Sequence, residues 1–282
     1  MNYVKARVQL EKKNKRFSIN KYIKTPKGTV LIELIILLLI ASFHSGALLG
    51  FRNAFLGMVT GLAFDFVIAL IMKRGKRFSD GGMITGLIIV LVLSPFVTYY
   101  IVIATTVIAL ASKHIFKDKR KPIFNPAAFG LLFAAVFFFA GQSWWGGLTM
   151  QPAWCMTILL LAGYFMTYRL NKFPQVFAFL GTYVILFTAL GFFHIGYAGD
   201  ALRLPFINCA LFLAFFMMTD PPTSPARNRD QVVFGIITAL VGTLIYVWLG
   251  GLTYLLVGLL TANGWKAWLA KRKMKERQIK AA

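Results

Sequence analysis

Carboxylates inside apolar stretches are the first residues of this sequence that could do chemistry. Asp65 lies in the middle of the run GLAFDFVIAL, and Glu33 lies near the start of an earlier apolar run. A carboxylate at membrane depth costs roughly 2.5–3.5 kcal/mol on insertion scales, so it usually faces the protein interior or a path for water. Asp65 is therefore predicted to handle an ion or a proton. The alternative for Asp65 is a buried, hydrogen-bonded carboxyl group that helps helices pack, and Glu33 could simply reach the lipid headgroups.

Two polar residues, Ser79 and Asp80, lie between a basic segment and the apolar run GGMITGL (81–87). Ser79 or Asp80 can cap a helix that begins here, because the first amides of a helix lack partners within it. The same helix end carries partial positive charge, which suits a phosphate or a carbonyl oxygen. We interpret the segment either as a helix cap or as part of a cofactor or ion site.

Two further segments combine polar residues with proline. Asn125 and Pro126 have the types and the order of a helix cap followed by a first turn. In MMTDPPTSPARNRD (217–230), Thr219 and Asp220 end an apolar run, and the prolines that follow forbid continued helix. This pattern predicts a rigid turn with a charged rim, and by itself it names no chemistry.

Secondary-structure elements must position these residues, and the amino-acid composition limits which kind of element is possible. The chain has 282 residues, of which 58% are hydrophobic and 14% charged, with a mean hydropathy of +0.69. Such a chain is too apolar for a water-soluble surface, and apolar runs of about 20 residues cross a bilayer as helices. We therefore predict an all-α integral membrane protein. Its ten expected spans are residues 29–50, 54–72, 82–94, 97–115, 126–141, 153–168, 174–195, 205–219, 232–249 and 251–265.

The formal net charge of +22 is carried almost wholly by tails and short loops. If the amino terminus is cytoplasmic, 29 of the 31 Lys and Arg residues fall on the cytoplasmic side, as the positive-inside rule requires. This placement indicates topology and attraction to anionic lipid, and not nucleic-acid binding. We expect a basic cytoplasmic tail (1–28), a single polytopic domain in the cytoplasmic membrane (29–265) and a second basic cytoplasmic tail (266–282).

Two apolar runs, 81–95 and 250–264, are short for a full crossing and open with a glycine pair. They lie in opposite halves of the chain, which favours an inverted repeat of five plus five spans with short or broken helices. Cys155 and Cys209 lie within apolar runs and lack the spacing of metal ligands, so no metal site is expected. The segment WWGG (144–147) indicates an interfacial aromatic belt or a surface that stacks on a planar cofactor.

Three segments together resemble the RnfD/NqrB family: SDGGMITGLIIVLVLSP (79–95), KPIFNPAAFG (121–130) and FFMMTDPPTSPARNRDQVVFGIITALVG (215–242). They occur in the family's order and with about its spacing, and the resemblance extends over about residues 79–275. It implies a ten-span, inverted-repeat subunit that binds flavin and passes electrons in a complex coupled to sodium or proton translocation. Such a subunit is part of a membrane oxidoreductase and not a complete enzyme. Its expected partners are the lipid bilayer and electron-transport subunits that carry flavin or iron–sulfur centres.

The resemblance also implies which residues surround the flavin or the conduction region: Asp80, Thr85, Asn125, Thr219, Asp220 and Asn228. In the family, a Ser-Gly-Ala-Thr type motif in the outer loop after the fifth span carries FMN on its Thr through a phosphodiester bond. Here that loop reads GQSWWGGLTMQPAW (141–154), which offers Ser143 and Thr149 without the motif. Thr149 is the candidate for covalent FMN. The chain resembles a divergent member, expected to bind FMN or riboflavin without a covalent bond.

The departure in the outer loop leaves other functions open. The main alternative is a transporter or channel that keeps the inverted-repeat scaffold, lacks redox chemistry and moves an ion or small solute past Asp65. A third hypothesis is an assembly or anchoring protein that binds no cofactor. A flavin absorbance spectrum of the purified protein separates the first hypothesis from the other two.

Overall fold

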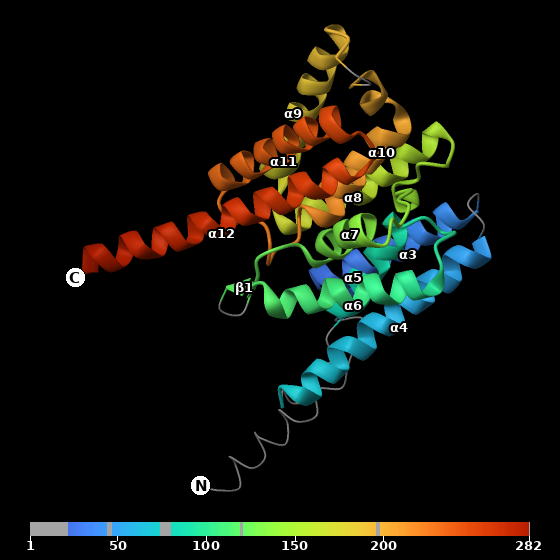
Figure 1. The fold of residues 1–282 in the computed structure, drawn as a ribbon, viewed down its shortest axis with the longest axis horizontal. Helices are drawn as coiled ribbons and strands as arrows, with labels where there is room; N and C mark the ends of the chain where they lie inside the picture. The colour runs from blue at the N-terminus through green and yellow to red at the C-terminus, as the bar shows by residue number, and fades with distance from the viewer. Residues whose placement is uncertain (1–21, 44–46, 74–79, 119–120, 196–197, 282) are drawn as a thin grey trace, which may run out of the picture.

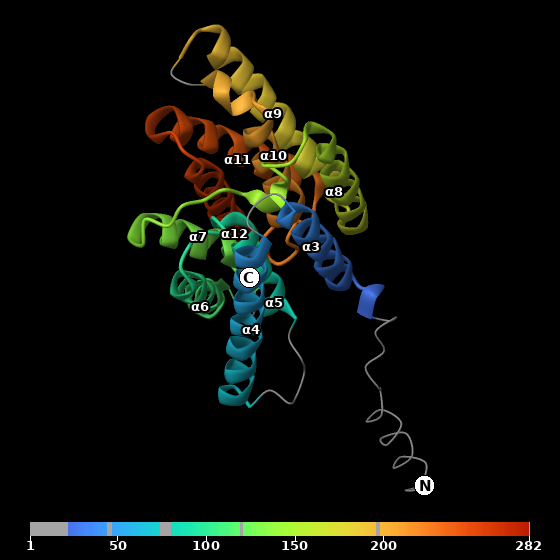
Figure 2. The same cartoon turned by 90° about the vertical axis from the view of Figure 1, so that its right-hand side faces the viewer.

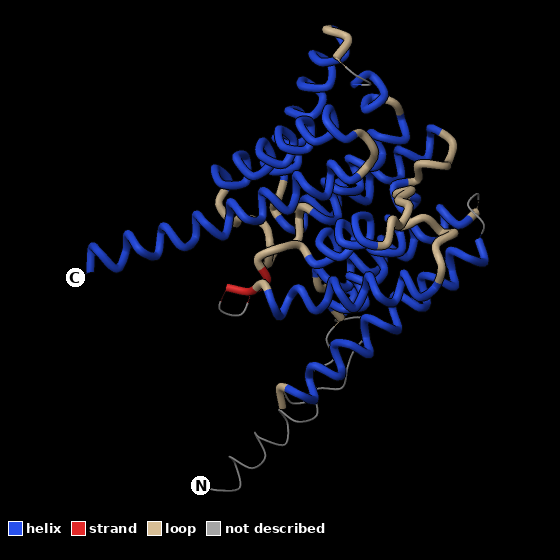
Figure 3. Tube along the Cα trace, in the orientation of Figure 1, coloured by secondary structure: helices blue, strands red, loops and turns tan. Residues whose placement is uncertain are grey.

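The computed structural model describes residues 22–43, 47–73, 80–118, 121–195 and 198–281. Within these residues the chain forms ten α-helices and one short hairpin, which confirms the predicted all-α class (Figure 3). The helices are α3 (Pro26–Ser42), α4 (Ala47–Ile71), α5 (Gly81–Val92), α6 (Tyr99–Ile115), α7 (Pro126–Phe137), α8 (Met156–Leu170), α9 (Phe173–Phe192), α10 (Leu204–Phe212), α11 (Asn228–Leu249) and α12 (Thr253–Ala281). The smaller elements are the strands β1 (Lys117–Asp118) and β2 (Lys121–Pro122), the 3-10 helices η1 (Trp145–Gly147), η2 (Ala153–Cys155) and η3 (Ala198–Leu202), and the π-helical segment η4 (Leu213–Met217).

Each of the ten predicted apolar runs overlaps one of these helices, and the run 29–50 also extends past the end of α3 at Ser42 into the start of α4. Large apolar side chains cover their outer faces, and Phe192 and Trp248, for example, are 79% and 84% exposed. Such a surface suits lipid and not water. The protein is therefore a multi-pass membrane protein. Among the described residues, four helical stretches are long and apolar enough to cross a membrane: Leu48–Ile71, Ala153–Leu170, Phe173–Phe192 and Asn228–Leu249.

The helices form two neighbouring groups that follow the order of the chain (Figures 1 and 2). In the first group α4 packs against α5 and α6, and α6 packs against α7. In the second group α11 packs against both α9 and α12. Contacts of α3 with α8 and of α7 with α12 join the groups.

Helices α4 and α5 pack with their backbones almost in contact. Gly57 and Gly61 on α4 face Gly86 and Gly82 on α5, so each helix presents two glycines four residues apart. A Cβ atom built on Gly86 would lie 2.1 Å from the Gly57 oxygen, and one built on Gly61 would lie 2.2 Å from the Gly82 oxygen. Small residues at this spacing are typical of close helix pairs in membranes. The contact brings Asp65, one turn after Gly61, to the first turn of α5.

Helix α5 ends early, and the loop before η1 closes its carboxyl end. The carbonyl oxygen of Val92 accepts hydrogen bonds from the amides of Ser143 and Trp144, both at 3.0 Å. The indole N–H of Trp145 donates to the Val90 oxygen at 2.7 Å. Trp144 and Trp145 are 0% and 1% exposed, so the predicted interfacial belt is wrong for these two residues. A helix that stops inside the protein leaves carbonyls without partners, and a buried indole supplies a donor.

Helix α12 is longer than the sequence indicates. The run 250–264 was expected to be a short helix, but α12 continues from Thr253 to Ala281 and projects away from the rest of the chain (Figure 1). Asn263 does not end the helix, because its side chain makes tertiary hydrogen bonds to the Asn125 amide and the Thr223 oxygen. The basic segment after residue 265 is therefore helical.

Candidate functional site

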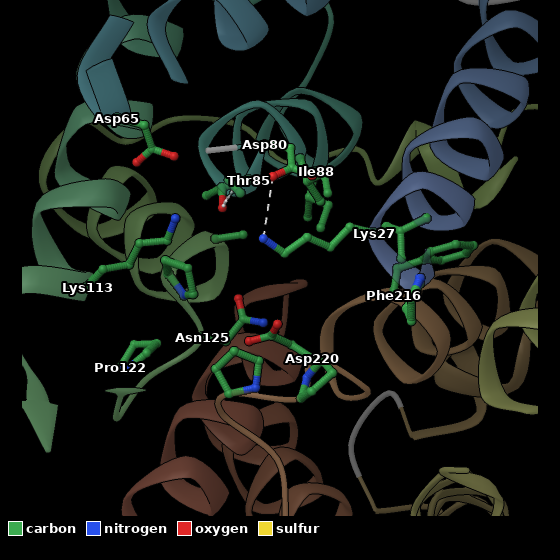
Figure 4. Close-up of a pocket in the computed structure, with 18 of the residues that line it drawn as sticks. Lys27, Asp65, Asp80, Thr85, Ile88, Lys113, Pro122, Asn125, Phe216 and Asp220 are labelled. Atoms are coloured by element: carbon green, nitrogen blue, oxygen red, sulfur yellow. Dashed lines mark hydrogen bonds and ion pairs between the residues drawn. The ribbon is translucent and has the colours of Figure 1, made fainter. Parts of the chain in front are cut away.

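A cavity of about 1280 Å³ lies where the ends of helices α3 to α8 meet the turn after η4. These are the helix ends next to the basic segments of the sequence. Figure 4 shows that polar side chains from several elements point into this space. Six residues singled out in the sequence line the cavity together: Asp65, Asp80, Thr85, Asn125, Thr219 and Asp220.

Two other predicted site residues do not line the cavity. Asn228 is the first residue of α11, where Arg227 occupies the cap position. Thr149 lies in the loop that covers the opposite end of α5, and its hydroxyl donates to the Ser143 oxygen at 3.0 Å. The structure thus separates Thr149 from the residues that the three motifs bring together.

The amino end of α5 is capped from a neighbouring helix. Asp65 on α4 accepts a hydrogen bond from the Gly82 amide, with 2.8 Å between Oδ2 and N. Asp80 occupies the cap position but makes no side-chain cap bond, so the predicted capping by Asp80 is wrong. Its Oδ1 instead forms an ion pair of 3.5 Å with Nζ of Lys27. Ser79, the other predicted cap, lies outside the described residues. Asp65 therefore caps α5 from a neighbouring helix, and its handling of an ion or a proton stays a prediction.

Asn125 caps α7, as predicted, and also ties three parts of the chain together. Its Oδ1 accepts from the Ala128 amide at 3.0 Å, and its Nδ2 donates to the Met217 oxygen at 2.9 Å. Its backbone amide donates to Oδ1 of Asn263 at 2.8 Å. Because the side-chain oxygen and nitrogen both have protein partners, Asn125 shapes the wall of the cavity.

The turn 217–226 is held by donors from four other elements. Beside Asn125, the side chains of Gln175 and Gln231 donate to the oxygens of Met218 and Ala226, at 2.5 and 3.2 Å. Two ammonium groups do the same: Lys266 binds the Pro222 oxygen at 2.5 Å, and Lys172 binds the Pro225 oxygen. Proline lacks an amide, so these carbonyls are not drawn into a helix and stay available as acceptors. The result is a fixed turn that presents Asp220 to the cavity.

Asp220 lies in this turn, outside the helices, with part of its side chain open to the cavity. Burial in the surrounding protein raises the pKa of Asp220. A hydrogen bond of 2.8 Å from the Thr223 hydroxyl to Oδ2, followed by the charges of Lys113, Lys266 and Lys172, opposes that rise in pKa. Burial is the larger influence, so the pKa of Asp220 lies above the usual value of an aspartate.

We predict that Asp220→Asn removes a pH-dependent loss of stability. A raised pKa means that the folded protein loses stability as the pH rises through that pKa, since the unfolded chain releases the proton more readily. The melting temperature of Asp220→Asn, relative to that of the wild type, should therefore increase as the pH rises above the usual aspartate pKa of about 4. Thermal unfolding in detergent at several pH values measures the difference. Asp200→Asn, in η3 away from the cavity, is the control, and a difference that does not change with pH would contradict the prediction.

Sequence reasoning missed Lys113, which was counted with a basic loop. It lies in the last turn of α6, and its side chain lines the cavity (Figure 4). The buried residues Val102, Thr106 and Ala109 precede it at helical spacing, and that pattern could have placed Lys113 on the inner face. Lys27, at the start of α3, was also missed, because it was counted with the basic tail.

The lining of the cavity mixes charge with apolar walls. Three carboxylates and three lysines balance one another, and the apolar part includes Ile84, Ile88, Met166 and Phe216. A site of this kind suits an uncharged molecule that has apolar surface together with hydrogen-bond donors and acceptors. It has no surplus of positive charge for a phosphate group.

A helical membrane bundle with an interior cavity of mixed polarity defines a polytopic membrane protein with space for a ligand or an ion between its helices. Two stretches of the chain, residues 17–149 and 141–271, match the model of the NQR2, RnfD, RnfE family. The chain belongs to this family, whose members are membrane components of Rnf and Nqr complexes. A search of curated proteins found no match.

Proposed function

We propose that this protein is a membrane electron-transfer subunit that binds riboflavin, without a covalent bond, in the cavity between α3 and the turn 217–226. The observation that carries the proposal is the convergence of residues from three separate motifs on that cavity. Family membership supports the same role.

The cavity fits the flavin ring better than it fits a flavin phosphate. Apolar side chains from α5, α8 and η4 can cover the faces of an isoalloxazine ring. The hydroxyls of Thr85 and Thr219 already donate to backbone oxygens, at 2.8 and 2.5 Å, and can still accept from a ligand. The balanced charge favours riboflavin over FMN. Thr149 remains the candidate for covalent FMN, at a separate place.

Bound flavin would supply reversible acceptance of electrons, which no protein side chain of this site provides. The chain's own residues would do the rest. Ile88 and Phe216 would exclude water from the ring, Asp220 would lie where it can exchange a proton with the ring, and the braced turn would fix its orientation.

The proposed membrane topology follows from the distribution of the Lys and Arg residues. All ten helices would cross the membrane as two inverted repeats of five, with both termini and the cavity at the cytoplasmic side of the cytoplasmic membrane. Two consecutive matches to one family model and the basic segments beside the cavity support this arrangement. Subunits with flavin or iron–sulfur centres would exchange electrons with the cavity. Asp65 would belong to a path for sodium ions or protons.

The purified protein tests the proposal. We expect riboflavin absorbance in detergent that leaves the pellet on acid precipitation, and saturable quenching of added riboflavin by protein from which the flavin was stripped. Absorbance that stays with the pellet would show a covalent flavin instead. A protein with no chromophore that also fails to bind added riboflavin would contradict the proposal and favour the non-redox transporter.

A further inference from the structure

Lys113 differs from the other lysines that line the cavity. Lys27 pairs with Asp80, and Lys117 lies exposed in β1. Lys113 is half-buried, and in the part of the chain that the structure describes its ammonium group makes no hydrogen bond or ion pair. Figure 4 shows the side chain of Lys113 directed into the open space of the cavity. An ammonium has three donors, so a half-buried one calls for acceptors from a ligand or from water.

The nearest opposite charges leave this ammonium available. Asp65 and Asp220 both act on Lys113 electrostatically, but neither forms an ion pair with it. The Asp65 carboxylate is held by the Gly82 amide, and the Asp220 carboxylate is held by the Thr223 hydroxyl. Lys113 thus stands between two fixed carboxylates, opposite the apolar walls.

We propose that Lys113 binds the electron-rich edge of the bound flavin ring and thereby raises its reduction potential. This proposal rests on the riboflavin-binding function proposed above. The pyrimidine edge of an isoalloxazine ring carries carbonyl and ring-nitrogen acceptors, and negative charge collects there when the ring takes up two electrons. A positive charge near this edge favours the reduced ring over the oxidised one.

The test compares Lys113→Met with Lys117→Met. Both variants remove one positive charge from the lining of the same cavity, but Lys113 is half-buried whereas Lys117 is exposed. Stripped protein is titrated with riboflavin by fluorescence quenching, and the midpoint potential of the bound ring is measured by dithionite titration. Dithionite supplies the two electrons, and the buffer supplies the protons.

We expect Lys113→Met to weaken binding of reduced riboflavin about tenfold more than binding of oxidised riboflavin. For a two-electron couple this corresponds to a midpoint potential lower by about 30 mV. Lys117→Met should keep the wild-type midpoint, and Lys113→Arg should keep most of it because the charge remains. Lys113→Gln, which keeps donors without charge, should resemble Lys113→Met and replaces it if the methionine variant does not fold.

The outcomes separate the two proposals. If the wild type binds no riboflavin, the proposed function fails, and this inference fails with it. If the wild type binds riboflavin and Lys113→Met and Lys113→Gln keep the wild-type midpoint, Lys113 is only a solvated lysine at the cavity and the proposed function stands. Equal shifts in Lys113→Met and Lys117→Met would show a general effect of charge and would also overturn the role of Lys113.

Discussion

Gly86→Ala is expected to lower the free energy of unfolding by about 2–3 kcal/mol, the upper part of the range for overpacked cores. The added Cβ atom would lie 2.1 Å from the Gly57 oxygen, and this is a backbone atom that no rotamer change can move. Helices α4 and α5 would have to separate, which would also stretch the bond between Asp65 and the Gly82 amide.

Thermal unfolding in detergent with a thiol-reactive fluorogenic dye measures this effect, because Cys155 and Cys209 are free and buried in the folded protein. Gly181→Ala is the matched control. Gly181 lies within α9 with nothing near its would-be Cβ, so alanine there should stabilise the helix by up to about 1 kcal/mol. Equal melting temperatures for Gly86→Ala and Gly181→Ala would show that the α4–α5 contact is looser than described.

Asn125→Ala is expected to cost roughly 2–4 kcal/mol and to reduce riboflavin binding. The substitution removes a helix cap, worth about 1 kcal/mol, and leaves the buried Met217 oxygen without its donor, worth about 1–3 kcal/mol. Because the turn after Met217 carries Asp220, a looser turn should also displace Asp220 in the lining of the cavity. Melting temperature and riboflavin quenching measure the two effects.

Two further variants separate the contribution of the helix cap from that of the hydrogen bond to Met217. Thr25→Ala removes the cap of α3, which also precedes a proline but lies on the exposed side of the chain, and should cost only about 1 kcal/mol. Asn125→Asp keeps the acceptor for the Ala128 amide and loses the donor to Met217. If Asn125→Ala behaves like Thr25→Ala in both measurements, Asn125 is only a helix cap.

Local signals in the sequence predicted the helices well. Apolar runs located all ten, Asn125 and Pro126 marked the start of α7, and Ser94 with Pro95 marked the end of α5 within two residues. These signals depend on neighbours along the chain, so one sequence suffices to detect them.

The rest of the site depends on contacts between distant segments. The cap of α5 comes from Asp65, 17 residues before Gly82, and no local pattern distinguishes it from Asp80. Helix α12 passes through Asn263 because that side chain is bound to two distant segments. Lys113 lay near the end of the predicted span 97–115, but its charge was counted with the basic segment that follows. Convergence on one cavity was implied only by the family resemblance.

Helix α5 is fixed along its whole length. Asp65 holds its first turn, glycine contacts hold its middle, and Trp145 holds its last carbonyls. Sliding or tilting of α5 alone would break all three attachments. We therefore expect α4, α5 and the loop that holds Trp144 and Trp145 to move as one rigid body. Relative movement of the helices is then left to the boundary between these three elements and the second group of helices. The cavity lies between α5 and the turn after η4, so such a movement would change the volume of the cavity before it changed any helix.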